Sequence, residues 1–140
     1  MMRERAAAPA MDLAHFCDEW LAAWTGGDAE RLAAYYADDC FYSDPTRPAG
    51  VRGRDELRRY LAKWLPQYAR MVWTRRGLYA TEGGFCVTWD ARIPVAGQWL
   101  EERGMDLVLL DGTGRIARNE VYFDMTRWRA LLAERPRGEA

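Results

Sequence analysis

The sequence contains almost no histidine or lysine, and it has no long apolar run. Its 140 residues include one histidine, His15, and one lysine, Lys63, and the formal net charge is −1. A single histidine excludes zinc sites built from several histidines and disfavours a Ser-His-Asp triad. A net charge near zero provides no general attraction to phosphate backbones or acidic membranes. We therefore expect neither nucleic acid nor a membrane as a partner, and no metal site.

Cysteine is also scarce, and its spacing indicates a reducing compartment. Cys17, Cys40 and Cys86 form no C-x-x-C pair, and an odd count without framework spacing is typical of free thiols. The first residues, MMRERAAAPAMD, lack the apolar segment of a secretory signal. The glycine-rich segments TGGD and DGTG match neither a dinucleotide nor a phosphate-binding loop. We expect a cytoplasmic protein without a cofactor.

Apolar and aromatic residues are abundant. The sequence is 49% apolar and contains seven tryptophans and seven tyrosines. A chain of this length forms one domain with a sizeable core, and aromatic residues also suit the walls of a small-molecule pocket. We expect a single domain over residues 12–133, a disordered tail at 1–11 and a loose tail at 134–140.

The first half of the chain has helical periodicity. Apolar residues at i, i+3, i+4 and i+7 spacing predict helices over 12–24, 29–39 and 54–65, with Asp12 and Asp28 as N-caps. A short strand is expected at 40–43, followed by a Pro/Gly loop.

From residue 71 the apolar period changes to two. This pattern predicts four consecutive antiparallel strands and a final helix, at 71–80, 85–95, 99–110, 115–124 and 125–136. Helices followed by an antiparallel meander indicate an α+β fold, in which a curved sheet wraps over the helices and leaves a concave interior face.

One acidic residue lies at the end of the short strand. Asp44 shares a strand face with Tyr42, because side chains alternate along a strand. An aspartate before a proline is also a common turn starter. At this point Asp44 is either a turn residue or a carboxylate that faces a cavity.

A second acidic residue lies within an apolar strand. Asp106 is flanked by Met105, Leu107 and Val108, so both faces of its strand are apolar. A buried carboxyl there must be paired, hydrogen-bonded or protonated. Structural and functional interpretations are equally open, because structural networks also contain perturbed carboxyls.

Two other polar strand residues have simpler interpretations. Asp90 shares the polar side of its strand with Thr88 and Arg92, which favours an ion pair on a solvated face. Asn119 shares a face with Phe123, so it points inward if Phe123 does.

The residues resemble a known family. The segments WLAAWTGGDAERLAAYYADDCFYSDP and RIARNEVYFD, with the element order around them, resemble the SnoaL-like branch of the NTF2-like superfamily over residues 12–130. The resemblance implies a cone in which three N-terminal helices pack against a strongly curved antiparallel sheet that encloses a pocket. It also implies a homodimer. Members include ketosteroid isomerase, polyketide cyclases and limonene-epoxide hydrolase.

Similarity to ketosteroid isomerase implies roles for three positions. Asp44 falls on the general base, and Asp106 falls on the protonated aspartic acid that donates to the developing oxyanion. Trp20 replaces the tyrosine that supplies the second donor, for which Tyr42, Tyr35 or Tyr36 could compensate.

Similarity to limonene-epoxide hydrolase is weaker. Asp90 falls on one acid of its Asp-Arg-Asp set, but Thr88 and Val121 replace the arginine and the second aspartate. Tyr42 and Asp44 fall on its water-orienting tyrosine and asparagine. A cyclase that uses one carboxylic acid remains open.

These observations leave three hypotheses. The first is a cofactor-independent isomerase or cyclase acting on a small apolar carbonyl compound, the second an epoxide hydrolase or epoxide-opening cyclase, and the third a non-catalytic small-molecule-binding module. The candidate catalytic residues are Asp44, Asp106, Tyr42, Trp20 and Asp90. The candidate substrate-binding residues are Tyr35, Trp64, Trp89, Asn119, Val121 and Phe123.

Overall fold

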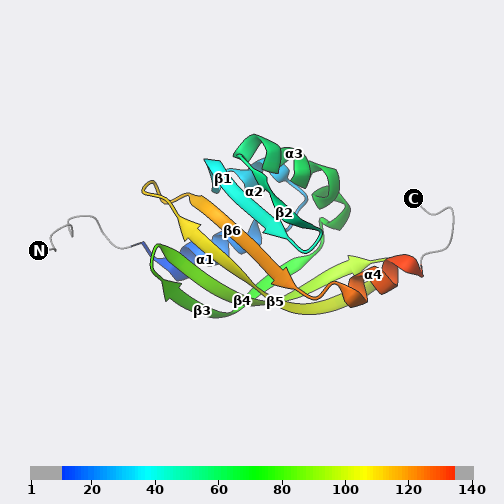
Figure 1. The fold of residues 1–140 in the computed structure, drawn as a ribbon. Coiled ribbons are helices and arrows are strands. Elements are labelled where there is room, and N and C mark those ends of the chain that lie inside the picture. Colours follow the sequence, from blue (N-terminus) through cyan, green and yellow to red (C-terminus); the bar gives the residue numbers. More distant parts are fainter. Residues whose placement is uncertain (1–10, 135–140) are drawn as a thin grey trace, which may run out of the picture.

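A computed structural model describes residues 11–134, which form four α-helices, one 3₁₀ helix and six strands (Figure 1). In chain order these are α1 (Leu13–Ala22), α2 (Ala29–Ala33), β1 (Tyr36–Asp44), β2 (Arg47–Arg52), α3 (Arg54–Trp64), η2 (Leu65–Tyr68), β3 (Val72–Thr81), β4 (Gly84–Val95), β5 (Gln98–Leu110), β6 (Ile116–Phe123) and α4 (Thr126–Ala133). The predicted tails lie outside the described residues, apart from Met11 and Glu134.

All six strands form one curved sheet in the order β2-β1-β6-β5-β4-β3 (Figure 1). Neighbouring strands are antiparallel except β1 and β6, which are parallel. The α+β class is therefore confirmed, with one parallel pair that the sequence pattern did not predict. In Figure 1, α1 lies behind the strands and α3 lies beside the β1–β2 edge.

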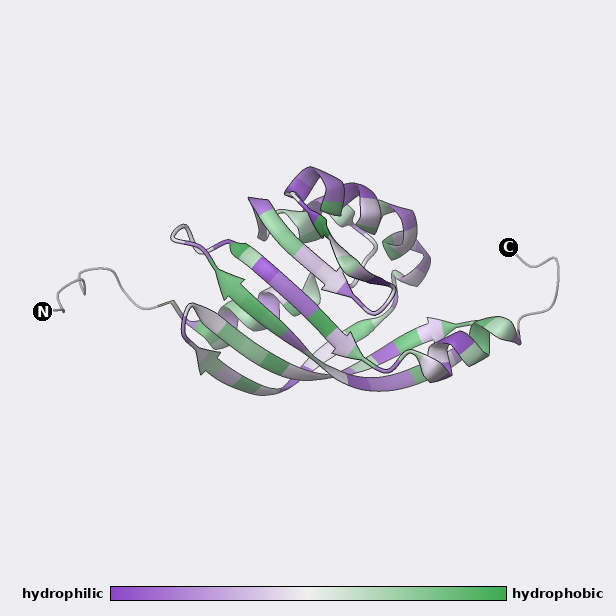
Figure 2. Cartoon of the chain, in the orientation of Figure 1, coloured by the Kyte–Doolittle hydropathy of each residue, from purple (hydrophilic) through white to green (hydrophobic). Residues whose placement is uncertain are grey.

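Local sequence signals explain most element boundaries. The side chains of Asp12 and Asp28 accept hydrogen bonds from the backbone N–H groups of His15 and Arg31, as expected for N-caps. The helix predicted at 54–65 and the four strands predicted from residue 71 are confirmed to within about one residue at each end. In Figure 2, bands of hydrophobic and hydrophilic residues alternate along β4, whereas the end of β5 is hydrophobic throughout.

The segment between residues 34 and 53 differs from the prediction. The second helix ends at Ala33, and β1 begins at Tyr36, where the sequence predicted helix up to residue 39. Pairing of Tyr36 with Ile116 of β6 overrides the local helical preference of this segment.

The predicted Pro/Gly loop is also a strand. β2 is one of the two edge strands of the sheet, where Pro48 is tolerated because its missing N–H need not pair. Gly50 has a φ of 88°, and a Cβ there would lie 2.2 Å from the Phe41 ring. β1 and β2 pair as an antiparallel hairpin. Its two connecting residues, Pro45 and Thr46, come directly after Asp44.

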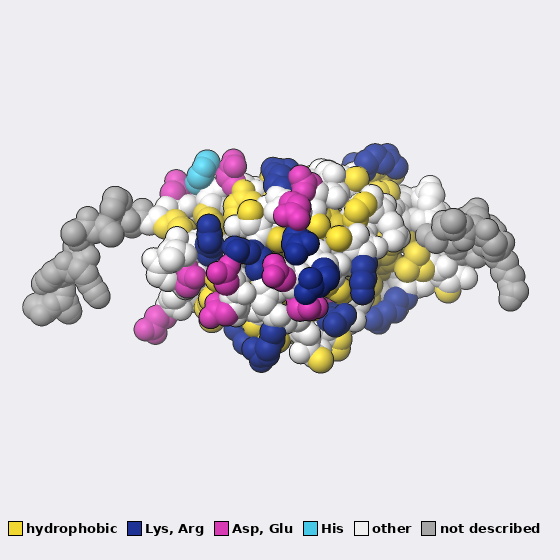
Figure 3. Space-filling model, turned by 90° about the horizontal axis from the view of Figure 1, so that it is seen from above, with side chains coloured by type: hydrophobic (Ala, Val, Ile, Leu, Met, Phe, Trp, Pro, Cys, Tyr) yellow, Lys and Arg dark blue, Asp and Glu magenta, His cyan; other side chains and the backbone are white. Residues whose placement is uncertain are grey.

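The surface carries charges of both signs. On the face drawn in Figure 3, basic and acidic side chains are interspersed. Within residues 11–134, no helix has the length and apolar composition needed to cross a membrane.

Candidate active site

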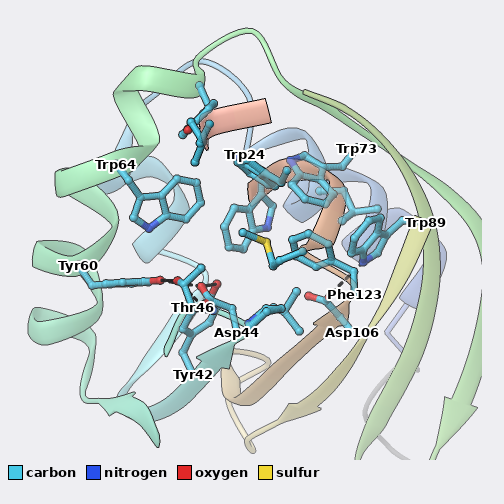
Figure 4. A pocket seen from close by; sticks show the side chains of 17 residues that line it. Trp24, Tyr42, Asp44, Thr46, Tyr60, Trp64, Trp73, Trp89, Asp106 and Phe123 are labelled. Atoms are coloured by element: carbon cyan, nitrogen blue, oxygen red, sulfur yellow. Dashed lines mark hydrogen bonds between the residues drawn. The ribbon is translucent and has the colours of Figure 1, made fainter. Parts of the chain in front are cut away.

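A cavity of about 260 Å³ lies between the concave face of the sheet, α3 and α4. Its wall is mainly aromatic: Trp24 is 6.2 Å, centroid to centroid, from each of Trp64 and Trp73, and Trp73 is 4.5 Å from Trp89 (Figure 4). The side chains that line the cavity are Leu21, Trp24, Tyr42, Asp44, Pro45, Thr46, Tyr60, Trp64, Tyr68, Trp73, Trp89, Asp106, Val121, Phe123, Met125, Trp128 and Leu132. Only two of them are formally charged, Asp44 and Asp106.

Asp44 lies on one side of this cavity and accepts four hydrogen bonds (Figure 4). Its Oδ2 accepts from the phenols of Tyr42 at 2.7 Å and Tyr60 at 2.8 Å. Its Oδ1 accepts from the backbone N–H and the hydroxyl of Thr46, both at 2.9 Å. An ionised carboxylate only accepts hydrogen bonds, so this set of donors suits the ionised form.

Both interpretations of Asp44 that the sequence left open therefore apply. Asp44 starts the β1–β2 turn through its bonds to Thr46, and the same carboxylate faces the cavity. The turn fixes one oxygen, while the phenols from β1 and α3 fix the other.

The phenols beside Asp44 stay protonated at ordinary pH. Burial, and then the adjacent Asp44, raise the pKa of Tyr42 well above its usual value. Burial and Asp44 also raise the pKa of Tyr60, to about 12. Both phenols therefore remain hydrogen-bond donors to the carboxylate.

Asp106 lies on the other side of the cavity and is 3% exposed. Its Oδ1 accepts from the indole N–H of Trp89 at 2.8 Å, and its Oδ2 accepts from Nδ2 of Asn119 at 3.0 Å. Burial raises the pKa of Asp106 from 3.8 to about 7; the two hydrogen bonds oppose that rise, and the charge of Asp44 adds to it. Asp106 is therefore a carboxylic acid for a large fraction of molecules at neutral pH.

A glycine allows Trp89 to reach Asp106. Gly104 lies opposite Trp89 in the β4–β5 pair, and Asp106 follows two residues later on the same strand face. A Cβ on Gly104 would lie 2.6 Å from the indole ring, so the absence of a side chain lets the ring lie across β5.

Three predicted site residues do not line the cavity. Trp20 does not line the cavity; its indole N–H donates to the Tyr36 phenol at 3.2 Å. Asn119 does not line it either and holds Asp106 instead. Tyr35 packs edge-on against Phe16, outside the lining set.

Asp90, which was included in the predicted catalytic set, does not line the cavity. It lies on the outer side of β4, where its half-exposed carboxylate pairs with Arg103 at 3.0 Å and Arg76 at 3.6 Å. The alternation of β4 puts Trp89 and Ala91 inside and Asp90 outside. The ion pair favoured by the sequence pattern is confirmed, and a role for Asp90 at the cavity is wrong.

The structure brings the other predicted residues together and adds several. Tyr42, Trp64, Trp89, Val121 and Phe123 line the cavity with the two acids. The lining residues that sequence reasoning did not assign to the site include Tyr60, Thr46, Trp24 and Trp128. Tyr60 lies within the helix predicted at 54–65, but its contact with Asp44 depends on β2, which was not predicted.

Helix α4 closes part of the cavity. Trp128 and Leu132 of α4 are lining residues, and the Trp128 ring lies 5.2 Å from that of Tyr68. Arg127 donates to the buried carboxylate of Glu102 at 3.1 Å, which fixes α4 to β5.

The described residues offer no metal-binding cluster. Across residues 11–134, no group of three or more His, Cys, Asp or Glu side chains is arranged to hold a metal ion. The two carboxyls at the cavity, Asp44 and Asp106, can exchange protons with a bound molecule.

A family model for the SnoaL-like domain matches residues 17–119. The chain belongs to the SnoaL-like family. No curated protein sequence matches this SnoaL-like chain.

Solved structures share its fold. The protein RV0760c from Mycobacterium tuberculosis is 13% identical, with a TM-score of 0.69 over 84% of this chain and 96% of its own. SalBIII, described as an epoxide hydrolase/cyclase-like enzyme in pyran ring formation in the polyether salinomycin, is 18% identical, with a TM-score of 0.68 over 81% and 91%. A SnoaL-like protein of unknown function from Burkholderia thailandensis is 16% identical, with a TM-score of 0.66 over 83% and 99%. At these identities the comparison shows the fold.

The buried acid predicts an unusual pH dependence of stability. The folded-state pKa of Asp106 is raised, so between pH 3.8 and about 7 the unfolded chain releases this proton while the folded chain retains it. The contribution of Asp106 to the free energy of unfolding is therefore fully present below pH 3.8 and falls as the pH rises to about 7, by an amount on the order of 4 kcal/mol. In urea denaturation across this range, the free energy of unfolding of wild type is expected to fall relative to that of Asp106→Asn, because the other carboxyls contribute equally to both proteins. Parallel pH curves for the two proteins would contradict the prediction.

Proposed function

We propose that this SnoaL-like protein is a cofactor-independent isomerase or cyclase that transfers a proton on a small apolar carbonyl compound. The observation that carries the proposal is the pair of acids in one aromatic cavity: Asp44, surrounded by donors, and Asp106, buried with a pKa of about 7. Two carboxyls whose environments separate their protonation states can serve as base and acid at the same pH.

In the proposed reaction, the Asp44 carboxylate removes a proton from the carbon next to the substrate carbonyl. The electron pair of the broken C–H bond moves into the carbonyl group, and protonated Asp106 donates a hydrogen bond to the oxygen that becomes negative. Asp44 then returns its proton to another carbon of the enolate. For a β,γ-unsaturated ketone the product is the conjugated ketone.

Asp44 needs a free lone pair to act as a base, and a change of hydrogen-bond partner by Tyr60 can supply it. The Tyr60 phenol lies 2.8 Å from Asp44 Oδ2 and 2.9 Å from the Thr46 hydroxyl. Tyr60 can therefore donate to Thr46 instead, which frees a lone pair of the carboxylate for the substrate proton. Tyr42 continues to hold the same oxygen.

The remaining cavity wall is formed mainly by tryptophan, tyrosine and phenylalanine rings, which favours a flat, mostly apolar molecule.

Epoxide-opening cyclisation is a second candidate. It would use Asp106 as the acid that protonates the epoxide oxygen and Asp44 as the base that activates a substrate hydroxyl. The buried acid favours it, as does the structural likeness to SalBIII. The two candidates predict different products from the same site.

The test is an assay of purified protein with two substrates. A small cyclic β,γ-unsaturated ketone is expected to gain conjugated-enone absorbance, and a hydroxy-epoxide of similar size is expected to be unchanged. Cyclic ether from the hydroxy-epoxide, without enone from the ketone, would replace the first candidate by the second. Binding of both compounds without turnover would indicate a non-catalytic binding module.

A further inference from the structure

We propose that Tyr36 is a positioning residue that, through Asn119, keeps a hydrogen-bond donor turned toward Asp106. Its kinetic consequence rests on the proposed function, whereas its structural consequence does not. The sequence offered Tyr36 only as a tyrosine that could replace the missing oxyanion donor, but Tyr36 is fully buried and does not line the cavity.

The indole N–H of Trp20 sets the direction of the first hydrogen bond in this chain of residues. An indole N–H only donates, so the Tyr36 oxygen must accept from Trp20 Nε1 at 3.2 Å. The Tyr36 proton is then available for Oδ1 of Asn119, at 2.8 Å. Because Oδ1 is occupied as an acceptor, the Nδ2 group of Asn119 is the one that faces Asp106.

The reversed amide would change the preferred state of Asp106. If Asn119 rotated by about 180°, its oxygen would face Asp106 Oδ2, and two acceptors would meet unless Asp106 were protonated. The Leu107 carbonyl, which accepts from Nδ2 at 3.2 Å, also favours the present orientation. Tyr36 and Leu107 together therefore favour the ionised form of Asp106, against the burial that favours the protonated form.

Few other ionisable groups face Asp106. Asp44 across the cavity raises its pKa, and Asp106 in turn raises the pKa values of Cys17 on α1 and Tyr36 on β1, whose largest cause is burial. Trp89 donates from β4 and does not titrate. Of the side chains that donate to Asp106, Asn119 is the one whose orientation depends on the Tyr36 hydroxyl.

The expected effect of Tyr36→Phe is an upward shift of the Asp106 pKa. The substitution removes one hydroxyl and keeps the ring, so Asn119 loses the bond that fixes its oxygen. We expect a shift of about one pKa unit, the equivalent of one weakened hydrogen bond. Asn119→Leu removes the donor itself and is expected to cause an upward shift at least as large.

The test is a ¹³C NMR titration of the Asp106 carboxyl in the ligand-free protein, with Asp106→Asn used to assign the resonance. Wild type, Tyr36→Phe, Asn119→Leu and the double variant are compared. Tyr35→Phe serves as the matched control, because it removes the neighbouring phenol outside this hydrogen-bond chain. The double variant is expected to titrate like Asn119→Leu, because Tyr36 acts through Asn119.

Two results would overturn the inference. One is an Asp106 pKa that stays at its wild-type value in Tyr36→Phe. The other is a double variant whose shift equals the sum of the single shifts, since Tyr36 would then act on Asp106 by another route. If Tyr36→Phe is too unstable to titrate, Trp20→Phe removes the donor at the start of the chain and is expected to cause a smaller upward shift.

The kinetic readout separates this inference from the proposed function. If protonated Asp106 is the acid, the fall in rate above neutral pH moves to higher pH in Tyr36→Phe. An NMR shift in a protein that turns over neither substrate would support the inference and contradict the proposed function. Turnover with an unshifted Asp106 would do the reverse.

Discussion

Replacing Asp44 by asparagine is expected to lower the rate of enone formation by about 10²–10⁴-fold, the range that a positioned general base contributes. The amide keeps the size of the carboxylate but has far too little basicity to remove a proton from carbon. Its NH₂ group would also face the phenols or Thr46, which now donate to the two carboxylate oxygens. The measurement is kcat/KM for the ketone, with circular dichroism to establish that the variant is folded.

The matched control for this experiment is Asp90→Asn. It makes the same chemical change on the outer side of β4, at a half-exposed ion pair with Arg103. We expect its kcat/KM to stay within about twofold of wild type, because exposed ion pairs contribute little. Full activity in Asp44→Asn would remove the proposed base and leave the aromatic cavity as a binding site.

Replacing Asp106 by leucine is expected to lower kcat by about 10²–10³-fold, the usual effect of losing one donor to a developing oxyanion. Leucine fills the space but cannot donate, and it leaves the Trp89 and Asn119 N–H groups without their present acceptors. Asp106→Asn, which retains an N–H donor, is expected to lose less activity.

The pH profile gives this prediction a second readout. Wild-type activity should fall as the pH rises through about 7, because the donor is the protonated form of Asp106. Asp106→Asn does not titrate, so its rate should show no fall in that range. A fall at the same pH in both proteins would assign the titration to another group.

The sequence predicted the sheet well because period-two alternation is a strong local signal. β3 to β6 follow from it almost residue by residue, and the same alternation correctly placed Asp90 beside arginines. The inward position of Asp106 also follows locally, because an acid between apolar neighbours on both faces must be buried.

What the sequence could not predict depends on contacts between distant segments. The Pro/Gly composition of residues 47–52 disguised an edge strand, and without β2 the approach of Tyr60 to Asp44 could not be foreseen. The role of Asn119 was missed for a similar reason. Alternation shows which face a side chain occupies, but not that Tyr36, 83 positions earlier, supplies its partner.

The two acids occupy very different parts of the sheet. Asp44 precedes a two-residue turn at the edge hairpin, whereas Asp106 lies in β5, between two fully paired neighbours. Lengthening or shortening the Pro45–Thr46 connection would relocate Asp44, the proposed base, while leaving Asp106, the proposed acid, with Trp89 and Asn119 in place. Relatives with the same interior strands could thus acquire different regiochemistry by varying one short connection at the sheet margin.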